Sequence, residues 1–371
     1  MMKSNAQSLS GKSMDLLSHL LLLPRDGETS SSQEVEELRL DVLSMSIDGF
    51  HNLVSLAKSN HVIVRGLEVF FRIACKNKDD MRADWAQTAL ATERSRIALA
   101  LSYLEDICLT FEYEKYDVTV IKSLDHWPDL GSDVDLYTNA ESGDVSQLMK
   151  RHFSAEIAPR SWGDRLANKW NFVIPGLPES VEIHMGRLGQ TGEHVEMASH
   201  IARRSRRVVI GKRAFPVPSA TDRLMISTLQ RMYRHFYFRL CDIVDSAALS
   251  NEGAIDFMDL CSSAMQAGIW EGVATYLVIV SDYVSKYSGT GLNLPEFVRA
   301  AARFGGNEVY FAREFLRVPI MPQAARLYRS QLAGLLRKRE IQNGARLSLL
   351  PWLATAALVG QRITGSDKGI W

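Results

Sequence analysis

The chain has little cysteine, no net charge and no long hydrophobic run, and each absence excludes a class of protein. Its 371 residues include only four cysteines, without a Cys-x-x-Cys pair or a Cys/His cluster at zinc spacing. These are Cys75, Cys108, Cys241 and Cys261. A disulfide framework and a local zinc motif are therefore excluded. The scatter favours reduced, buried thiols on apolar helical faces of a cytoplasmic protein.

The charges of the chain balance. Lys and Arg together number 43, as do Asp and Glu, which leaves no bulk charge to drive binding to nucleic acid or membranes. Any site for a polyanion must therefore come from a local patch. The longest apolar runs, residues 16–23 and 347–359, are too short to span a bilayer, and the first lacks the cleavage site of an export signal. We expect no stable membrane insertion.

Hydrophobic residues at 46% and charged residues at 23% fit an ordinary globular enzyme. Apolar residues follow helical spacing over 33–111, short alternating runs over 117–217, and helical spacing again from 221. The expected fold class is α+β, with a small mixed sheet between helical regions. The predicted divisions are a partly flexible N-terminal segment over 1–32, a helical region over 33–112, an α+β core over 113–218 and an all-helical C-terminal domain over 219–371.

Residues 131–137, Gly-Ser-Asp-Val-Asp-Leu-Tyr, form the most informative stretch. Asp133 and Asp135 are separated by one residue, so on a strand both carboxylates point to the same face. Two adjacent carboxylates repel each other unless a cation lies between them, and Mg²⁺ prefers such oxygen ligands. An Asp-x-Asp pair alone is a weak signal, because solvated strand edges and turns also contain it.

Two further segments strengthen this metal-site interpretation. Downstream, residues 180–186 alternate so that Glu182 and His184 share the face opposite the apolar side chains. Upstream, residues 117–123 form a β-branched run that ends in Lys122 and Ser123. Three such strands would bring Glu182 and the two aspartates together as a triad able to hold two metal ions.

The order of these segments resembles the DNA polymerase β-type nucleotidyltransferase superfamily, and most closely its bacterial uncharacterised nucleotidyltransferase family. The resemblance covers about residues 115–250 and includes the strand ending in Lys, the Asp-hydrophobic-Asp pair, the Glu-hydrophobic-His strand and a helical half over 229–249. The superfamily usually has a Gly-Gly or Gly-Ser pair after the first strand. Here Ser123 remains and the Gly is absent, which makes a close backbone approach to phosphates less secure.

The resemblance implies a metal-dependent enzyme that moves a nucleoside monophosphate from a nucleoside triphosphate to a hydroxyl acceptor and releases pyrophosphate. Asp133, Asp135 and Glu182 would be its catalytic residues and the ligands of Mg²⁺ or Mn²⁺. The residues expected to bind nucleotide or substrate are Lys122, Ser123, Ser132, His184, Arg204, Arg207, Arg239 and Asp242. The acceptor stays open between RNA, protein, a sugar and a small molecule.

Some of these assignments have competing structural interpretations. Arg204 and Arg207 belong to a run of six basic residues over 203–213, which could hold phosphates or be a solvated helix end. Arg239 and Asp242 are predicted to form an intrahelical pair on one helix over 229–249, beside the nucleotide pocket. His184 could contact the acceptor or only orient Glu182.

Two other function classes also stay open. A glycosyltransferase can use an Asp-x-Asp pair to hold a metal and a sugar nucleotide. Such an enzyme would require a nucleotide-binding α/β half ahead of the motif, where this chain is expected to be helical. A non-catalytic scaffold or regulator descended from a nucleotidyltransferase would explain the missing Gly after Lys122. The three retained carboxylates argue against it.

Overall fold

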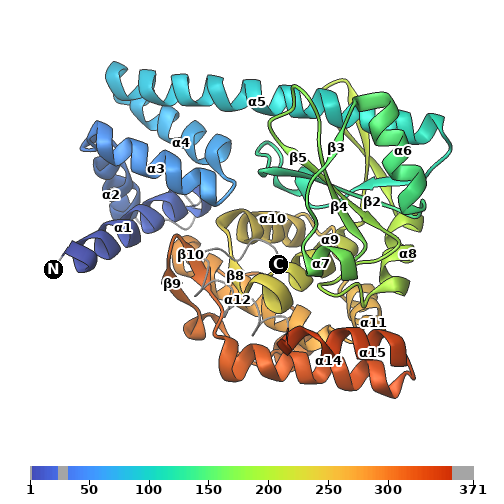
Figure 1. Ribbon diagram of the computed structural model, residues 1–371. Helices are drawn as coiled ribbons and strands as arrows, with labels where there is room; N and C mark the ends of the chain where they lie inside the picture. Colours follow the sequence, from blue (N-terminus) through green and yellow to red (C-terminus); the bar gives the residue numbers. More distant parts are fainter. Residues whose placement is uncertain (1, 24–31, 353–371) are drawn as a thin grey trace.

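The computed structural model describes residues 2–23 and 32–352 and shows an α+β protein built around a five-stranded mixed sheet (Figure 1). The N-terminal helices are α1 (Met2–Leu22), α2 (Ser32–Leu43), α3 (Ile47–Ser59), α4 (Ile63–Lys76) and α5 (Asp80–Tyr113). The central strands are β1 (Val118–Val120), β2 (Asp133–Thr138), β3 (Glu156–Ile157), β4 (Lys169–Val173) and β5 (Ser180–Met185). Between and after them lie η1 (Ser123–His126), α6 (Ser142–Phe153), α7 (Trp162–Leu166), α8 (Val195–Arg203), and the hairpin β6 (Arg206–Ile210) and β7 (Arg213–Val217).

The long helix α5 joins the N-terminal helices to the sheet (Figure 1). Asp79 caps its start, because the carboxylate accepts the N–H of Arg82 at 3.1 Å. Buried residues then recur at a spacing of three or four positions, as at Ala83, Ala86 and Leu90, and this spacing defines the face that packs inward. The helical spacing predicted over 33–111 is thus confirmed by α2 to α5.

The sheet order is β1-β2-β5-β4-β3, in which only β2 and β5 pair in parallel. Alternation on β2 buries Val134 and Leu136 and turns Asp133 and Asp135 to the other face. The parallel register places Asp135 beside Glu182 and Asp133 beside Ser180. Because parallel neighbours begin at the same edge of a sheet, the carboxylates of two distant segments meet there.

The C-terminal region is mainly helical, and the expectation that it is all-helical is wrong. Its elements are α9 (Ala220–Thr228), the π-helix η2 (Leu229–His235), β8 (Tyr237–Phe238), α10 (Leu240–Asn251), α11 (Phe257–Ala267), α12 (Trp270–Ser288), α13 (Glu296–Ala301), η3 (Gly306–Glu308), β9 (Tyr310–Ala312), β10 (Phe315–Arg317), η4 (Ile320–Ala324), α14 (Ala325–Arg337) and α15 (Ile341–Ser348). Strands β8, β10 and β9 form a second small sheet.

The single helix predicted over 229–249 is therefore two helices separated by a strand. Phe236 adopts a left-handed conformation, with φ +55°, which ends η2. Tyr237 then pairs with Arg317 in the second sheet, and its ring stacks on Phe315 with the centroids 4.4 Å apart. These tertiary contacts override the helical spacing of the segment.

The buried apolar side chains form one continuous cluster that includes residues from Met14 to Leu327. This core crosses the predicted divisions at 112/113 and 218/219, so the sheet and the C-terminal helices pack as one body. None of the helices in the described ranges combines the length and apolar character needed to cross a membrane. Residues 24–31 of the N-terminal segment predicted over 1–32, and residues 353–359 of the apolar stretch over 347–359, lie outside the described residues.

Candidate functional site

The site begins with the three carboxylates at the edge where β2 and β5 start. Asp135 and Glu182 face each other across the two strands, and their side chains are 13% and 14% exposed. Oxygen atoms of both carboxylates and a ring nitrogen of His184 lie within 4.8 Å of one another, so they could hold a metal ion. Asp133 is the most exposed of the three. The predicted convergence of the two segments is thereby confirmed, but the group of ligand atoms within 4.8 Å of one another contains His184 and not Asp133.

Lys122 lies between the two inner carboxylates. Its Nζ contacts Asp135 Oδ1 and lies 3.4 Å from Glu182 Oε1. Burial lowers the pKa of this ammonium, but Asp135 and Glu182 outweigh burial and raise the pKa above its usual value. The side chain therefore stays charged and compensates both anions.

The backbone reaches this position through a strained turn. Lys122 has φ +63° and ψ −54°, and Ser123 N–H donates to the carbonyl of Ile121 at 2.7 Å. This is a γ-turn with a positive φ at its centre, which is rare for a residue with a Cβ. Ser123 anchors the turn, because its Oγ accepts the N–H of Asp135 at 2.7 Å and donates to the carbonyl of Asp133 at 3.3 Å. The predicted strand over 117–123 therefore ends at Val120.

Glu182 is held by two further side chains. Lys169 Nζ lies 2.9 Å from Oε2, and His184 Nε2 lies 2.8 Å from Oε1. Burial raises the pKa of the Glu182 carboxyl, but Lys122, Lys169 and His184 together hold that pKa well below its usual range. Glu182 is thus ionised and fixed in position, and His184 orients it.

Asp133 has a different environment. Its carboxylate accepts hydrogen bonds from Ser180 Oγ at 3.2 Å and Ser132 Oγ at 3.3 Å, and among the described residues no basic side chain forms an ion pair with it. Burial and the neighbouring charges of Asp135 and Glu182 raise the pKa of Asp133. A bound cation would relieve this repulsion.

A basic wall faces the carboxylates across a cavity of about 170 Å³. It is formed by η2 and the residues that follow, and its polar members are Gln230, Arg231, Arg234, His235, Tyr237 and Arg239. Burial and the charges of Arg234, Arg231 and Arg239 hold the pKa of His235 well below its usual value, so its imidazole is neutral. The cavity therefore has an anionic side that suits cations and a cationic side that suits phosphates.

Asp242 lies outside this cavity. Its carboxylate accepts the backbone N–H of Arg239 at 2.7 Å and lies 2.7 Å from Arg231 Nε. Arg239 precedes α10 as its capping residue, so the intrahelical pair predicted from the i, i+3 spacing is wrong. Arg239 lines the cavity, whereas the buried Asp242 positions Arg231 against the ring of Tyr237.

Arg204 and Arg207 also lie away from the carboxylates. Arg204 forms an ion pair with Asp259 on α11, and Arg207 forms one with Glu112 on α5. Neither side chain lines the cavity beside Asp133. These two arginines therefore have ion-pair partners of their own. Among the predicted binding residues, those that join the carboxylate site are Lys122, Ser123, Ser132, His184 and Arg239.

Several site residues were absent from the sequence prediction, among them Lys169, Gln230 and Arg234. Lys169 begins β4, and its Nζ bridges Glu182 and Asp164 at 2.9 and 2.8 Å. Only the antiparallel register of β4 on β5 brings it there, and no motif marks it. Gln230 and Arg234 face the cavity from a π-helix, whose periodicity the helical spacing did not reveal.

The ion pair between Asp164 and Lys169 contributes to stability in a way that depends on pH. Burial raises the pKa of its carboxyl, but the Lys169 ammonium and hydrogen bonds from Ser161 outweigh burial and lower the pKa. Asp164 therefore stabilises the fold above its unfolded pKa, and this contribution is lost as the pH falls through the lowered folded value. We expect Asp164→Asn to reduce the free energy of unfolding by about 1–3 kcal/mol at pH 7.

Urea unfolding of the wild type and the Asp164→Asn variant at several pH values measures this difference. The difference in the free energy of unfolding between the two proteins should be constant near neutral pH. It should shrink below about pH 4, where the Asp164 carboxylate of the unfolded wild-type chain becomes protonated. A gap that widened with acid would contradict the proposed ion pair.

A scan against protein-family models and a search of curated proteins both find no match for this chain.

Proposed function

We propose that the protein is a metal-dependent nucleotidyltransferase, which transfers a nucleoside monophosphate from a nucleoside triphosphate to a hydroxyl acceptor. The observation that carries this proposal is the parallel register of β2 and β5, which sets Asp135 beside Glu182 and opposite a basic wall. The two sides of one cavity then match a metal-bound triphosphate, with carboxylates for the ions and cations for the phosphates.

The donor set fits Mg²⁺ or Mn²⁺. Asp133, Asp135 and Glu182 offer only oxygen atoms, which hard divalent cations prefer. Asp133 also has a raised pKa and no ion-pair partner among the described residues. A bound cation would stabilise its ionised form and lower that pKa. When bound, such ions would neutralise the triphosphate and activate the attacking hydroxyl.

The chain's own residues would bind and orient the nucleotide. Arg234 and Arg239 present guanidinium groups that can hold phosphate oxygens in a fixed geometry. The Tyr237 ring contacts the guanidinium groups of Arg231 and Arg239 in this wall and restricts their positions. Ser123 binds β2 through two hydrogen bonds, so its turn replaces the Gly-containing turn of the superfamily as a support for the carboxylate edge.

The glycosyltransferase alternative has less support. The described residues ahead of β2 form helices α1 to α5, the short strand β1 and the 3-10 helix η1, without the nucleotide-binding α/β half that this class requires. The scaffold alternative is favoured by one observation, namely that Lys122 already compensates Asp135 and Glu182. The three alternatives differ in the product that they release: pyrophosphate, a nucleoside diphosphate, or no product at all.

The test is an incubation of the purified protein with Mg²⁺ or Mn²⁺ and each radiolabelled nucleoside triphosphate, with RNA and cell extract as acceptors. We expect labelled monophosphate to join an acceptor with release of pyrophosphate, and chelation of the metal to stop the reaction. For the glycosyltransferase alternative, the same reaction is run with labelled sugar nucleotides, where release of a nucleoside diphosphate would favour that class. Metal-independent binding without turnover would favour the scaffold.

A further inference from the structure

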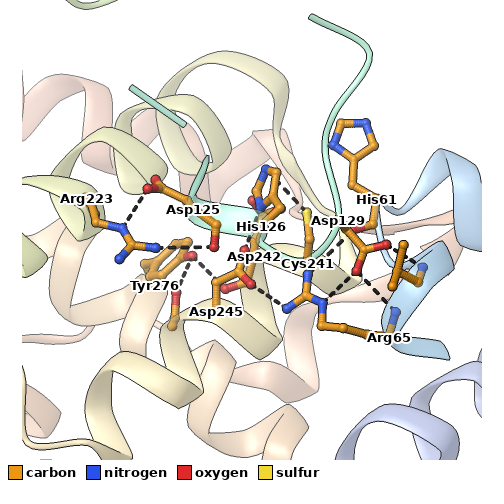
Figure 2. A network of polar contacts seen from close by, with 12 residues as sticks. His61, Arg65, Asp125, His126, Asp129, Arg223, Cys241, Asp242, Asp245 and Tyr276 are labelled. Atoms are coloured by element: carbon orange, nitrogen blue, oxygen red, sulfur yellow. Dashed lines mark hydrogen bonds and ion pairs between the residues drawn. The ribbon is translucent and has the colours of Figure 1, made fainter. Parts of the chain in front are cut away.

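Three side chains from distant segments converge beside the carboxylate site and offer a second set of metal ligands. His61 follows α3, His126 ends η1, and Cys241 lies in the first turn of α10 (Figure 2). One ligand atom of each lies within 4.8 Å of the other two. Since the residues are 65 and 115 positions apart, no zinc spacing marks them in the sequence.

The separations are close to those of a tetrahedral zinc site. His126 Nε2 lies 3.8 Å from Cys241 Sγ, and the rings of His61 and His126 have centroids 5.6 Å apart. Zn–N bonds of about 2.0 Å and Zn–S bonds of about 2.3 Å would separate N from S by about 3.5 Å.

The surroundings of His126 fit a metal ligand. Its Nδ1 lies 2.5 Å from Asp245 Oδ2, and Arg65 Nη1 holds the other oxygen of that carboxylate at 2.6 Å (Figure 2). Such a carboxylate fixes the ring orientation and, when it accepts the Nδ1 proton, leaves the Nε2 lone pair directed at Cys241. Metal-binding histidines usually have this partner.

His61 carries the second, independent observation. Its Nδ1 atom is buried and makes no hydrogen bond with any described residue. The turn that holds it has φ +54° at His61, a conformation unusual for a residue with a Cβ. His61 and His126 also line the cavity that contains Asp133 and Asp135, so a fourth coordination position could open toward that cavity.

We infer that His61, His126 and Cys241 bind one Zn²⁺ ion, with a solvent or substrate oxygen from the cavity as the fourth ligand. The soft thiolate and two imidazoles favour Zn²⁺ over the Mg²⁺ expected at the carboxylates. Binding converts the Cys241 thiol to a thiolate and releases its proton to solvent. The assignment rests on these three side chains and does not depend on the proposed nucleotidyl transfer.

The test uses the full chain, freed of metal and titrated with Co²⁺ and Zn²⁺. We expect about one equivalent of Co²⁺ to give the thiolate-to-cobalt charge-transfer absorption, and about one equivalent of Zn²⁺ to displace it. Cys241→Ser and His126→Ala should each lower the charge-transfer absorption to below about a tenth of its wild-type intensity. Far-ultraviolet circular dichroism checks that these variants are folded.

Matched controls separate this site from other thiols and from the carboxylates. Cys108→Ser, a buried cysteine on α5, and Cys261→Ser on α11 should retain the absorption band. Asp135→Asn should also retain it. Absence of the band from the wild type, or its survival in folded Cys241→Ser, would overturn the assignment without bearing on nucleotidyl transfer.

Discussion

Asp135→Asn is expected to lower the rate of nucleotidyl transfer by at least about 100-fold. Mutation of a residue that only orients a metal ligand already lowers activity by about 10–100-fold, and Asp135 would be a ligand itself. Asp135 is the carboxylate that lies beside Glu182 in the register and contacts Lys122. An amide oxygen is a neutral and weaker ligand for Mg²⁺. The measurement is the rate of pyrophosphate release at saturating metal and triphosphate.

Asp133→Asn should reduce activity in the same way but affect stability differently. Burial and its charged neighbours raise the pKa of Asp133, so ionising this carboxyl opposes folding, and the metal-free variant should be as stable as the wild type or slightly more stable. Asp135→Asn instead removes one of two anionic partners of the buried Lys122 and should lower the free energy of unfolding by about 1–3 kcal/mol.

Thermal unfolding in the presence of a chelator distinguishes the two variants. Full transfer activity in either variant would exclude that aspartate as a metal ligand. Equal destabilisation of both variants would show that the Asp135–Lys122 contact does not contribute to the fold.

Arg65→Ala should produce the largest loss of stability among the changes considered. Its guanidinium lies 2.8 Å from Asp129 and 2.6 Å from Asp245, whose side chains are 1% and 10% exposed (Figure 2). Asp129 also accepts the N–H of Val64 at 2.6 Å, which satisfies the first turn of α4. Removing the guanidinium leaves two buried carboxylates without this counter-ion. We therefore expect the free energy of unfolding to fall by about 3–5 kcal/mol.

The matched control is Arg94→Ala. Arg94 on α5 pairs with Glu68 on α4, but the two side chains are 56% and 42% exposed, so solvent screens the pair. Its loss should change the free energy of unfolding by less than about 1 kcal/mol. Similar values for Arg65→Ala and Arg94→Ala in urea unfolding would contradict the assigned importance of the buried network.

The carboxylate edge could be predicted from the sequence because alternation alone decides which side chains share a face of a strand. Asp133 and Asp135 on one strand, and Glu182 and His184 on another, satisfy that rule, and the structure places them as expected. The order of the strands in the sheet also brings Lys169 to Glu182, but this depends on pairing between segments. Pairing of that kind has no local pattern.

The region after residue 228 shows where such rules stop. Residues 229–249 have helical spacing throughout, yet Phe236 and Tyr237 leave the helix because their rings pack in a second small sheet. Arg239 consequently reaches the cavity from a capping position. Arg204 and Arg207 of the basic run over 203–213 lie away from the carboxylates for the opposite reason, since Asp259 and Glu112 on other helices bind them.

The turn at Lys122 has a consequence for how the protein would load its ions. The ammonium is a resident counter-ion, so a divalent cation entering between Asp135 and Glu182 must displace it. Binding of the ion would then exchange one positive group for another. Under the proposed function, the displaced Lys122 ammonium would be free to contact a triphosphate, which would couple binding of the ion to binding of the nucleotide.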